Sequence, residues 1–254
     1  MEGPTEVGIS INGGSGISME VKAAGSDGLS TVWEDGDAIS LWGIRDNGTS
    51  VLTAQPFTCY GLVDGAAFFT STLNAPMPEG EYTYYLAYPA PVSYSGLNAV
   101  FRIPARQDGK SGSGEDIMVS APVRHGPLLP IDWEAAGHDG ASFTMNHLLH
   151  RLRFYTEDSR FGGEAVQKIV ATFPRDVAGL VNIDLKNPEV SSISAEGSRT
   201  ITVDLKDPVP VSGTGSRNYI IASIAPASFT DGEGMQVRVY TETKVADVTI
   251  PLQS

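Results

Sequence analysis

SFTMNHLLHRLRFYTE, residues 142–157, carries the clearest secondary-structure pattern in the chain. Two sets of apolar residues alternate there with their neighbours and are out of phase by one residue: Phe143 with Met145, then Leu148 with Leu152 and Phe154. An apolar period of two marks a strand with one buried face, and a one-residue phase slip inside a strand is what a β-bulge produces. We therefore predict one long, bent strand over residues 142–157.

A helix is the alternative for the same residues. It would place Leu148, Leu149 and Leu152 on one side. The run Phe154-Tyr155-Thr156 consists of aromatic and β-branched residues, which favour a strand. The strand is therefore the preferred interpretation.

The composition predicts an all-β protein. Hydrophobic residues make up 41% of the 254 residues and charged residues 19%, which is typical of a globular chain and excludes a mainly disordered one. The 28 glycines and 16 prolines are spread over the whole chain and interrupt regular secondary structure. No stretch shows sustained helical periodicity. Short strands separated by turns fit this pattern.

The strand pattern restarts after residue 160, which suggests two domains. Strands are expected in the first part at residues 7–11, 17–21, 39–44, 56–60, 66–70 and 82–88, and in the second at 166–173, 180–185, 199–205, 218–225, 235–241 and 244–250. Six short strands at this spacing suffice for a small sandwich. We predict two tandem β-sandwich domains of Greek-key, transthyretin-like type, residues 1–159 and 160–254, with the boundary near Arg160.

The charge argues against two classes of partner. Seventeen basic residues against thirty acidic ones give a net charge of −13, which repels nucleic-acid phosphates and anionic lipid headgroups. No run of eighteen apolar residues occurs, so no transmembrane helix is expected. The first residues lack the basic and apolar parts of a signal peptide, which leaves a cytoplasmic protein or a sequence that starts after a removed leader.

No metal or cofactor site is expected. His147 and His150 are three residues apart, which places them on opposite faces of a strand, and His125 and His138 lie in loops without spaced partners. Zinc needs three or four converging ligands. Cys59 is the only cysteine, so the chain forms no intramolecular disulfide and no cysteine-rich metal site.

The chain is not expected to be an enzyme. It contains no Gly-x-Ser-x-Gly elbow, and Cys59 lies in an apolar strand, where its thiol would stay protonated. A hydrolase that uses two carboxylates remains an alternative, since thirty acidic residues always allow some pair at the required separation.

Three tyrosines define a candidate binding surface. Tyr82, Tyr84 and Tyr88 fall on one face of the strand at 82–88 together with Leu86. The face is either a platform on which sugar rings stack or an ordinary sandwich face whose hydroxyls reach the rim. The second interpretation is preferred.

The N-terminal residues predict two short strands and a site for proteolysis. Their apolar positions alternate on both sides of a glycine-rich loop: Val7, Ile9 and Ile11, then Ile17, Met19 and Val21. Residues 22–28 are small, apart from Lys22, and such an exposed loop is easily cut.

Five motifs in fixed order resemble a known family. They are Trp33-Glu34-Asp35-Gly36-Asp37-Ala38-Ile39, Tyr85-Leu86-Ala87-Tyr88-Pro89, Asp116-Ile117-Met118, residues 143–154 (FTMNHLLHRLRF) and residues 219–226 (YIIASIAP). The set resembles fimbrillin-type proteins, the major-fimbrial-antigen-like adhesins of Gram-negative anaerobes that build type V pili.

The resemblance implies a cell-surface pilus (fimbrium) subunit. In that family two β-sandwich domains stand in tandem, and the precursor is exported through a lipoprotein leader to the outer membrane. A protease cuts after a basic residue near the N-terminus, and a terminal strand of a neighbouring subunit fills the groove. The position matching that Arg-Ala cut is Lys22-Ala23, with lysine in place of arginine.

The chain departs from the family at both ends. It has no lipid-bearing cysteine near Met1, as expected of a sequence without its leader, so membrane attachment is expected only through a lipid anchor lost with that leader. Ser254 follows soon after the strand at 244–250, which leaves the donated strand unassigned.

Two hypotheses remain for the segment before Lys22. It is a removable plug, whose loss uncovers an apolar groove and an unpaired strand edge that another chain fills by β-strand addition, or it is a permanent part of the first sandwich. The expected function is a structural and adhesive pilus subunit, with other pilus subunits as partners and a host glycan or protein as the adhesion target. A surface carbohydrate-binding module is the alternative.

Overall fold

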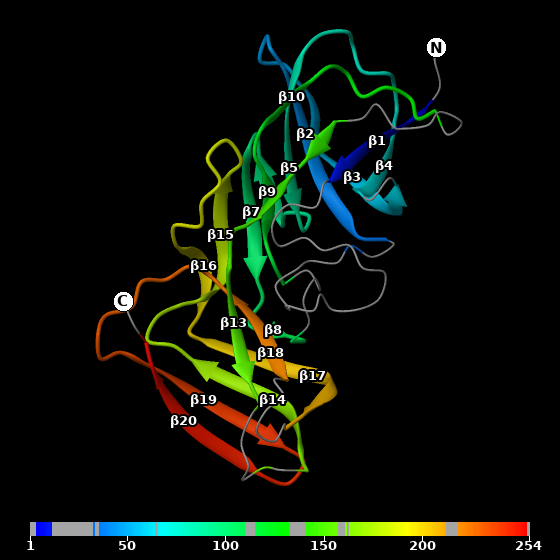
Figure 1. The fold of residues 1–254 in the computed structure, drawn as a ribbon. Helices are drawn as coiled ribbons and strands as arrows, with labels where there is room; N and C mark the ends of the chain where they lie inside the picture. Colours follow the sequence, from blue (N-terminus) through cyan, green and yellow to red (C-terminus); the bar gives the residue numbers. More distant parts are fainter. Residues whose placement is uncertain are drawn as a thin grey trace. The chain divides into compact units, whose positions relative to one another are not determined.

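The computed structural model describes most of the chain (Figure 1), namely residues 4–11, 33, 36–63, 66–109, 115–132, 141–156, 161, 163–211 and 218–252. Over these residues the regular elements are β-strands, so the prediction of an all-β protein is confirmed. None of the described residues forms a helix of the length and hydropathy that a membrane crossing requires.

The chain folds into two compact units, each built from three separate segments. Unit 1 consists of residues 1–101, 116–148 and 183–189, and unit 2 of residues 102–115, 149–182 and 190–254. A boundary near Arg160 between two tandem β-sandwiches stays a prediction.

Unit 1 is built on a nine-stranded sheet. Eight strands follow one another in the order β11 (Ser142–Phe143), β1 (Thr5–Ile11), β4 (Ala66–Leu73), β3 (Ser50–Val63), β2 (Ala38–Arg45), β5 (Tyr82–Tyr88), β9 (Met118–Ser120) and β12 (Met145–His147). The ninth, β10 (Val123–His125), pairs with β5. A hairpin of β6 (Ser93–Ser95) and β7 (Asn98–Ile103) is also present.

The first and last strands of this order are neighbours in the sequence. β11 pairs with β1 and β12 pairs with β9, and only Thr144 separates β11 from β12. One short segment therefore supplies both ends of the sheet and brings it close to a closed barrel. Closure removes unpaired strand edges, and the buried side chains of Phe143 and Met145 fix the segment to the core.

Strands form within residues 142–155, as predicted, but the prediction of a single long strand is wrong. β11 and β12 belong to unit 1, and a third strand, β13 (His150–Tyr155), belongs to unit 2. The chain passes from one unit to the other between Leu148 and Leu149. The phase slip in the sequence marks this change of sheet and not a β-bulge.

Unit 2 is built on a five-stranded sheet. Its order is β20 (Val245–Pro251), β19 (Gly234–Thr241), β14 (Ala165–Thr172), β17 (Thr200–Pro210) and β8 (Arg106–Gln107). β13 pairs with β18 (Tyr219–Ile224), and β15 (Ala178–Asp184) pairs with β16 (Ile193–Ser198). One face of the five-stranded sheet is buried, through Ile169, Ala171, Ile201, Val203, Met235 and Val237.

Glu164 fixes the turn between β19 and β20 to the start of β14. Its carboxylate accepts hydrogen bonds from the hydroxyls of Thr241 and Thr243 and lies 2.9 Å from the Lys244 ammonium. These partners stabilise the charged carboxylate, the Thr241 hydroxyl first, and lower the pKa of Glu164 to about 2.

Replacement of Phe143 tests the closure of the sheet. Phe143 is 1% exposed. We expect Phe143→Ala to lower the free energy of unfolding by about 3 to 5 kcal/mol, because it leaves a cavity in the core. The measurement is urea unfolding, with Leu129→Ala at an exposed site of unit 1 as the control. A loss no larger than that of the control would show that the segment does not hold the sheet.

Glu164→Gln tests the turn through its pH dependence. The folded pKa lies below the usual value of 4.5, so the carboxylate stabilises the fold above about pH 4.5, and this contribution disappears as the pH falls toward 2. We expect the variant to melt below the parent protein at pH 7 and the two melting temperatures to converge as the pH falls. A constant difference across this range would contradict the assignment.

Candidate functional site

The candidate site is β1 and the slot that holds it. On one edge all seven residues of β1 pair with β4, from Thr5 opposite Leu73 to Ile11 opposite Ala67. On the other edge Ser10 and Ile11 pair with β11. β1 is therefore an internal strand of the sheet (Figure 1), hydrogen-bonded on both sides.

Two further backbone contacts hold β1 on the side of β11. The amide of Ser10 donates to the carbonyl of Ala141 at 3.1 Å, and the amide of Ile131 donates to the carbonyl of Glu6 at 3.0 Å. Val7 also forms an isolated antiparallel bridge with Pro130. If β1 were removed, backbone groups of β4 and of these segments would lose their partners, which is costly in an apolar environment.

The side chains of β1 that face the core are fully buried. Val7, Ile9 and Ile11 are 1%, 0% and 0% exposed. Each such side chain contributes about 1.5 to 3 kcal/mol on burial, so the three together hold β1 by roughly 5 to 9 kcal/mol as an upper estimate. The slot thus has an apolar floor, the core surface that β1 covers, and two hydrogen-bonding walls, the edges of β4 and β11.

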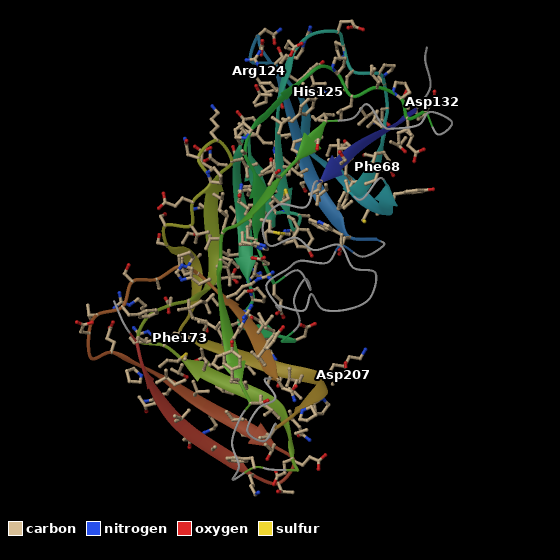
Figure 2. The ribbon with its side chains drawn as sticks, in the orientation of Figure 1. Phe68, Arg124, His125, Asp132, Phe173 and Asp207 are labelled. Carbon is tan, nitrogen blue, oxygen red and sulfur yellow. The ribbon has the colours of Figure 1, made fainter. Side chains whose placement is uncertain are left out.

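Gly8 shapes the opposite face of β1. A Cβ atom at Gly8 would lie 2.2 Å from Cζ of Phe68, a contact that no side chain tolerates. Phe68 belongs to β4 (Figure 2) and pairs directly with Ser10, so its ring reaches diagonally across the two strands and covers Gly8. The slot therefore accepts only a residue without a side chain at this position.

Trp33 extends the packing around the slot. Ile9 lies opposite Phe69 on β4, and the Trp33 ring meets the rings of Phe69 and Tyr88 edge to face at centroid distances of 5.1 and 5.0 Å. Two of the motifs that carry the family resemblance, those around Trp33 and Tyr88, thus meet in the core beside β1.

Half of the predicted plug lies in the described part of the chain. Val7, Ile9 and Ile11 form β1. Ile17, Met19 and Val21 and the candidate cleavage position Lys22-Ala23 fall outside the described residues.

The predicted sugar platform is buried in unit 1. Tyr82, Tyr84 and Tyr88 all belong to its hydrophobic core. The hydroxyls of Tyr82 and Tyr84 form internal hydrogen bonds. Tyr82 donates to the carbonyl of Pro78 at 2.6 Å, and Tyr84 donates to the carbonyl of Gly126 at 2.8 Å. Burial raises the pKa of Tyr84. Because these rings are covered, the burial favours the interpretation as an ordinary core face.

The buried Asp116 and the partly buried His147 form a pair that the sequence pattern does not predict. Asp116 is 2% exposed, and its carboxylate contacts Nδ1 of His147 at the ends of β9 and β12. In the sequence, His147 stands out only through its spacing from His150, as a candidate metal ligand. Over the part of the chain that the structure describes, no three His, Cys, Asp or Glu side chains gather as a metal site requires. The pair joins the two strands that complete the sheet.

Unit 2 carries an apolar hollow and an apolar edge strand. The hollow has a volume of about 520 Å³ and is lined by His150, Leu152, Phe173, Ile224, Ala227, Ser228, Phe229, Met235 and Leu252. β20 lies at the end of its sheet and exposes Val245, Val248 and Ile250. Long apolar edges of this kind pair readily with strands of other chains.

The fold is that of two solved adhesion-protein structures. A putative cell adhesion protein of Bacteroides uniformis matches with a TM-score of 0.58 and 13% identity, over 96% of this chain and 83% of that one. A second, from Bacteroides ovatus, matches with a TM-score of 0.55 and 11% identity, over 97% and 87%. At these identities the likeness shows a shared fold, which agrees with the family resemblance found in the sequence.

The other comparisons add less. The fimbrial anchor protein Mfa2 of Porphyromonas gingivalis matches over 91% of this chain and 76% of that one at 13% identity. Its TM-score of 0.35 is too low to show a shared fold. No protein-family model matches the chain, and no curated protein matches its sequence.

Gly8→Ala tests the fit of β1 in its slot. The methyl group would collide with the Phe68 ring, so we expect β1 to lift from the sheet and its amides to exchange hydrogen at least tenfold faster. Hydrogen exchange followed by mass spectrometry measures this. Gly126→Ala is the matched control, because nothing lies within 4 Å of its Cβ position. Equal protection of β1 in both variants would contradict the described packing.

Proposed function

We propose that the chain is a structural and adhesive subunit of a cell-surface pilus and belongs to the fimbrillin-like adhesins. The observation that carries the proposal is the slot of β1, which has an apolar floor and hydrogen-bonding walls on both sides. The fold likeness to two putative cell adhesion proteins and the ordered motifs support it.

In this proposal β1 is a plug that is exchanged during assembly. Cleavage at Lys22-Ala23 releases the segment that carries β1, and a terminal strand of another pilus subunit enters the slot by β-strand addition. The incoming strand restores the apolar contacts and the backbone hydrogen bonds that β1 made. The free energy that the contacts of β1 contribute to the fold would then stabilise the contact with the neighbouring subunit.

The remaining features of the proposal follow from family membership. The protein acts at the cell surface after export as a lipoprotein precursor to the outer membrane, it is not an enzyme, and its two domains are tandem β-sandwiches that meet near Arg160. Its partners are other pilus subunits, with a host glycan or protein as the adhesion target.

Deletion of residues 1–22 tests the plug. We expect the shortened chain, which starts at Ala23, to form ordered oligomers or fibres, while the full chain stays monomeric. Light scattering and electron microscopy measure this. A synthetic peptide with the sequence of β1, TEVGISI, should prevent assembly by refilling the slot.

The matched control is the same peptide with Ile9→Asp, which places a charge in the apolar floor and should not prevent assembly. A shortened chain that remains monomeric and melts at the temperature of the full chain would overturn the proposal. Unfolding into amorphous aggregates that the peptide does not reverse would show instead that β1 is a permanent strand.

A further inference from the structure

The outer face of the five-stranded sheet of unit 2 carries a polar surface with regular rows. The register places one residue of each strand in a row across β17, β14, β19 and β20. The three rows are Thr200, Thr172, Gln236 and Thr249; Thr202, Val170, Arg238 and Asp247; and Asp204, Lys168, Tyr240 and Val245. The opposite face of β14, β17 and β19 is buried in the core, so the side chains of these rows point outward.

The centre of this face is hollowed into a groove. The groove has a volume of about 460 Å³, and the outward side chains that line it are Val170, Thr172, Gln236, Arg238, Tyr240, Asp247 and Thr249. The volume lies in the range of sites that hold small molecules. The outward side chains combine one apolar and one aromatic residue with amide, hydroxyl, guanidinium and carboxylate groups, and Val237 and Val248 also line the groove. We call it the outer groove.

Arg238 and Asp247 form the charged part of the outer groove. Nε of Arg238 lies 2.6 Å from Oδ1 of Asp247, and Nη2 lies 3.1 Å from Oδ2. The side chains are still 53% and 64% exposed, so remaining N–H groups and oxygen lone pairs stay accessible. A two-point ion pair holds both groups in place, which lowers the cost of ordering them around a ligand.

Tyr240 supplies a flat surface beside this pair. Nζ of Lys168 lies 5.3 Å from the centre of its ring, and this contact orients the ring. The hydrogen bonds to Asp247 raise the pKa of Arg238, and the Tyr240 side chain lines the same groove. Ring and ion pair thus form one connected arrangement.

This combination matches the chemistry of a sugar. Each hydroxyl of a sugar both donates and accepts a hydrogen bond, so neighbouring hydroxyls can use the N–H groups of Arg238 and the oxygens of Asp247 together. The C–H face of a sugar ring packs on an aromatic ring. Gln236, Thr172 and Thr249 add donors and acceptors along the groove.

The charges favour a neutral ligand. Within the outer groove the single guanidinium and the single carboxylate neutralise each other. An anionic ligand would have to compete with Asp247 for Arg238 and would be repelled by the net charge of −13. We propose that the outer groove binds a neutral oligosaccharide. This site lies in unit 2, does not involve β1, and goes beyond the proposed role in assembly.

Binding of the full chain to immobilised neutral oligosaccharides tests the inference. The probes are fragments of β-glucan, xylan, α-mannan and arabinogalactan, with sialylated and uronate-containing glycans as the charged comparison. We expect binding to at least one neutral probe. We expect its dissociation constant to rise about tenfold in Tyr240→Ala, which removes the stacking surface, and about threefold in Gln236→Ala.

Tyr60→Ala is the matched control, because Tyr60 is an exposed tyrosine of unit 1, and its affinity should equal that of the parent protein. Thermal melting checks that the variants are folded, and Tyr240→Phe, which keeps the ring, should retain most of the affinity. Binding should also change little between 50 mM and 500 mM NaCl, as expected for an uncharged ligand.

Three results would overturn the inference: no binding to any neutral probe, binding unaffected by both Tyr240→Ala and Gln236→Ala, or binding that is confined to the charged glycans. The test uses the intact monomer, so any of these results would leave the assembly proposal standing. Conversely, failure of the shortened chain without residues 1–22 to assemble would leave the inference of sugar binding standing.

Discussion

The structure of unit 1 depends on the hydrogen bonds that both edges of β1 make. β1 pairs along its whole length with β4 and at its end with β11, and β11 is joined through Thr144 to β12 at the other end of the sheet. Without β1 the sheet would open beside β4 and the near-closure of the barrel would be lost. This N-terminal strand thus holds together the nine-stranded sheet of unit 1, which is why its removal would have structural consequences out of proportion to its length.

The sequence predicts strands well where one face is buried. The alternating segments at residues 166–173, 199–205 and 235–241 correspond to β14, β17 and β19. The short β11 and β12 were merged with β13, because the local pattern shows the period of two but not the sheet to which each strand belongs. The phase slip at Leu148 was visible, but its cause is the passage between units, which only long-range pairing reveals.

The candidate site was less predictable than the fold. The apolar alternation of Val7, Ile9 and Ile11 indicated a buried strand, yet nothing local showed that Gly8 lies under the ring of Phe68, sixty residues away. The three tyrosines were recognised as one face, but a period of two does not tell which face of a strand meets solvent. The outer groove is not predictable for a different reason, since Arg238 and Asp247 come together only through the register of β19 and β20.

The contact between Gly8 and Phe68 has a consequence for the proposed exchange of β1. An incoming strand with a side chain at that position would be rejected by the ring, whereas one carrying glycine there can seat fully. Under the proposed exchange of β1, the Phe68 ring would thus restrict both the alignment and the identity of the incoming strand. The choice of incoming strand would then depend on where it carries a glycine relative to its apolar residues.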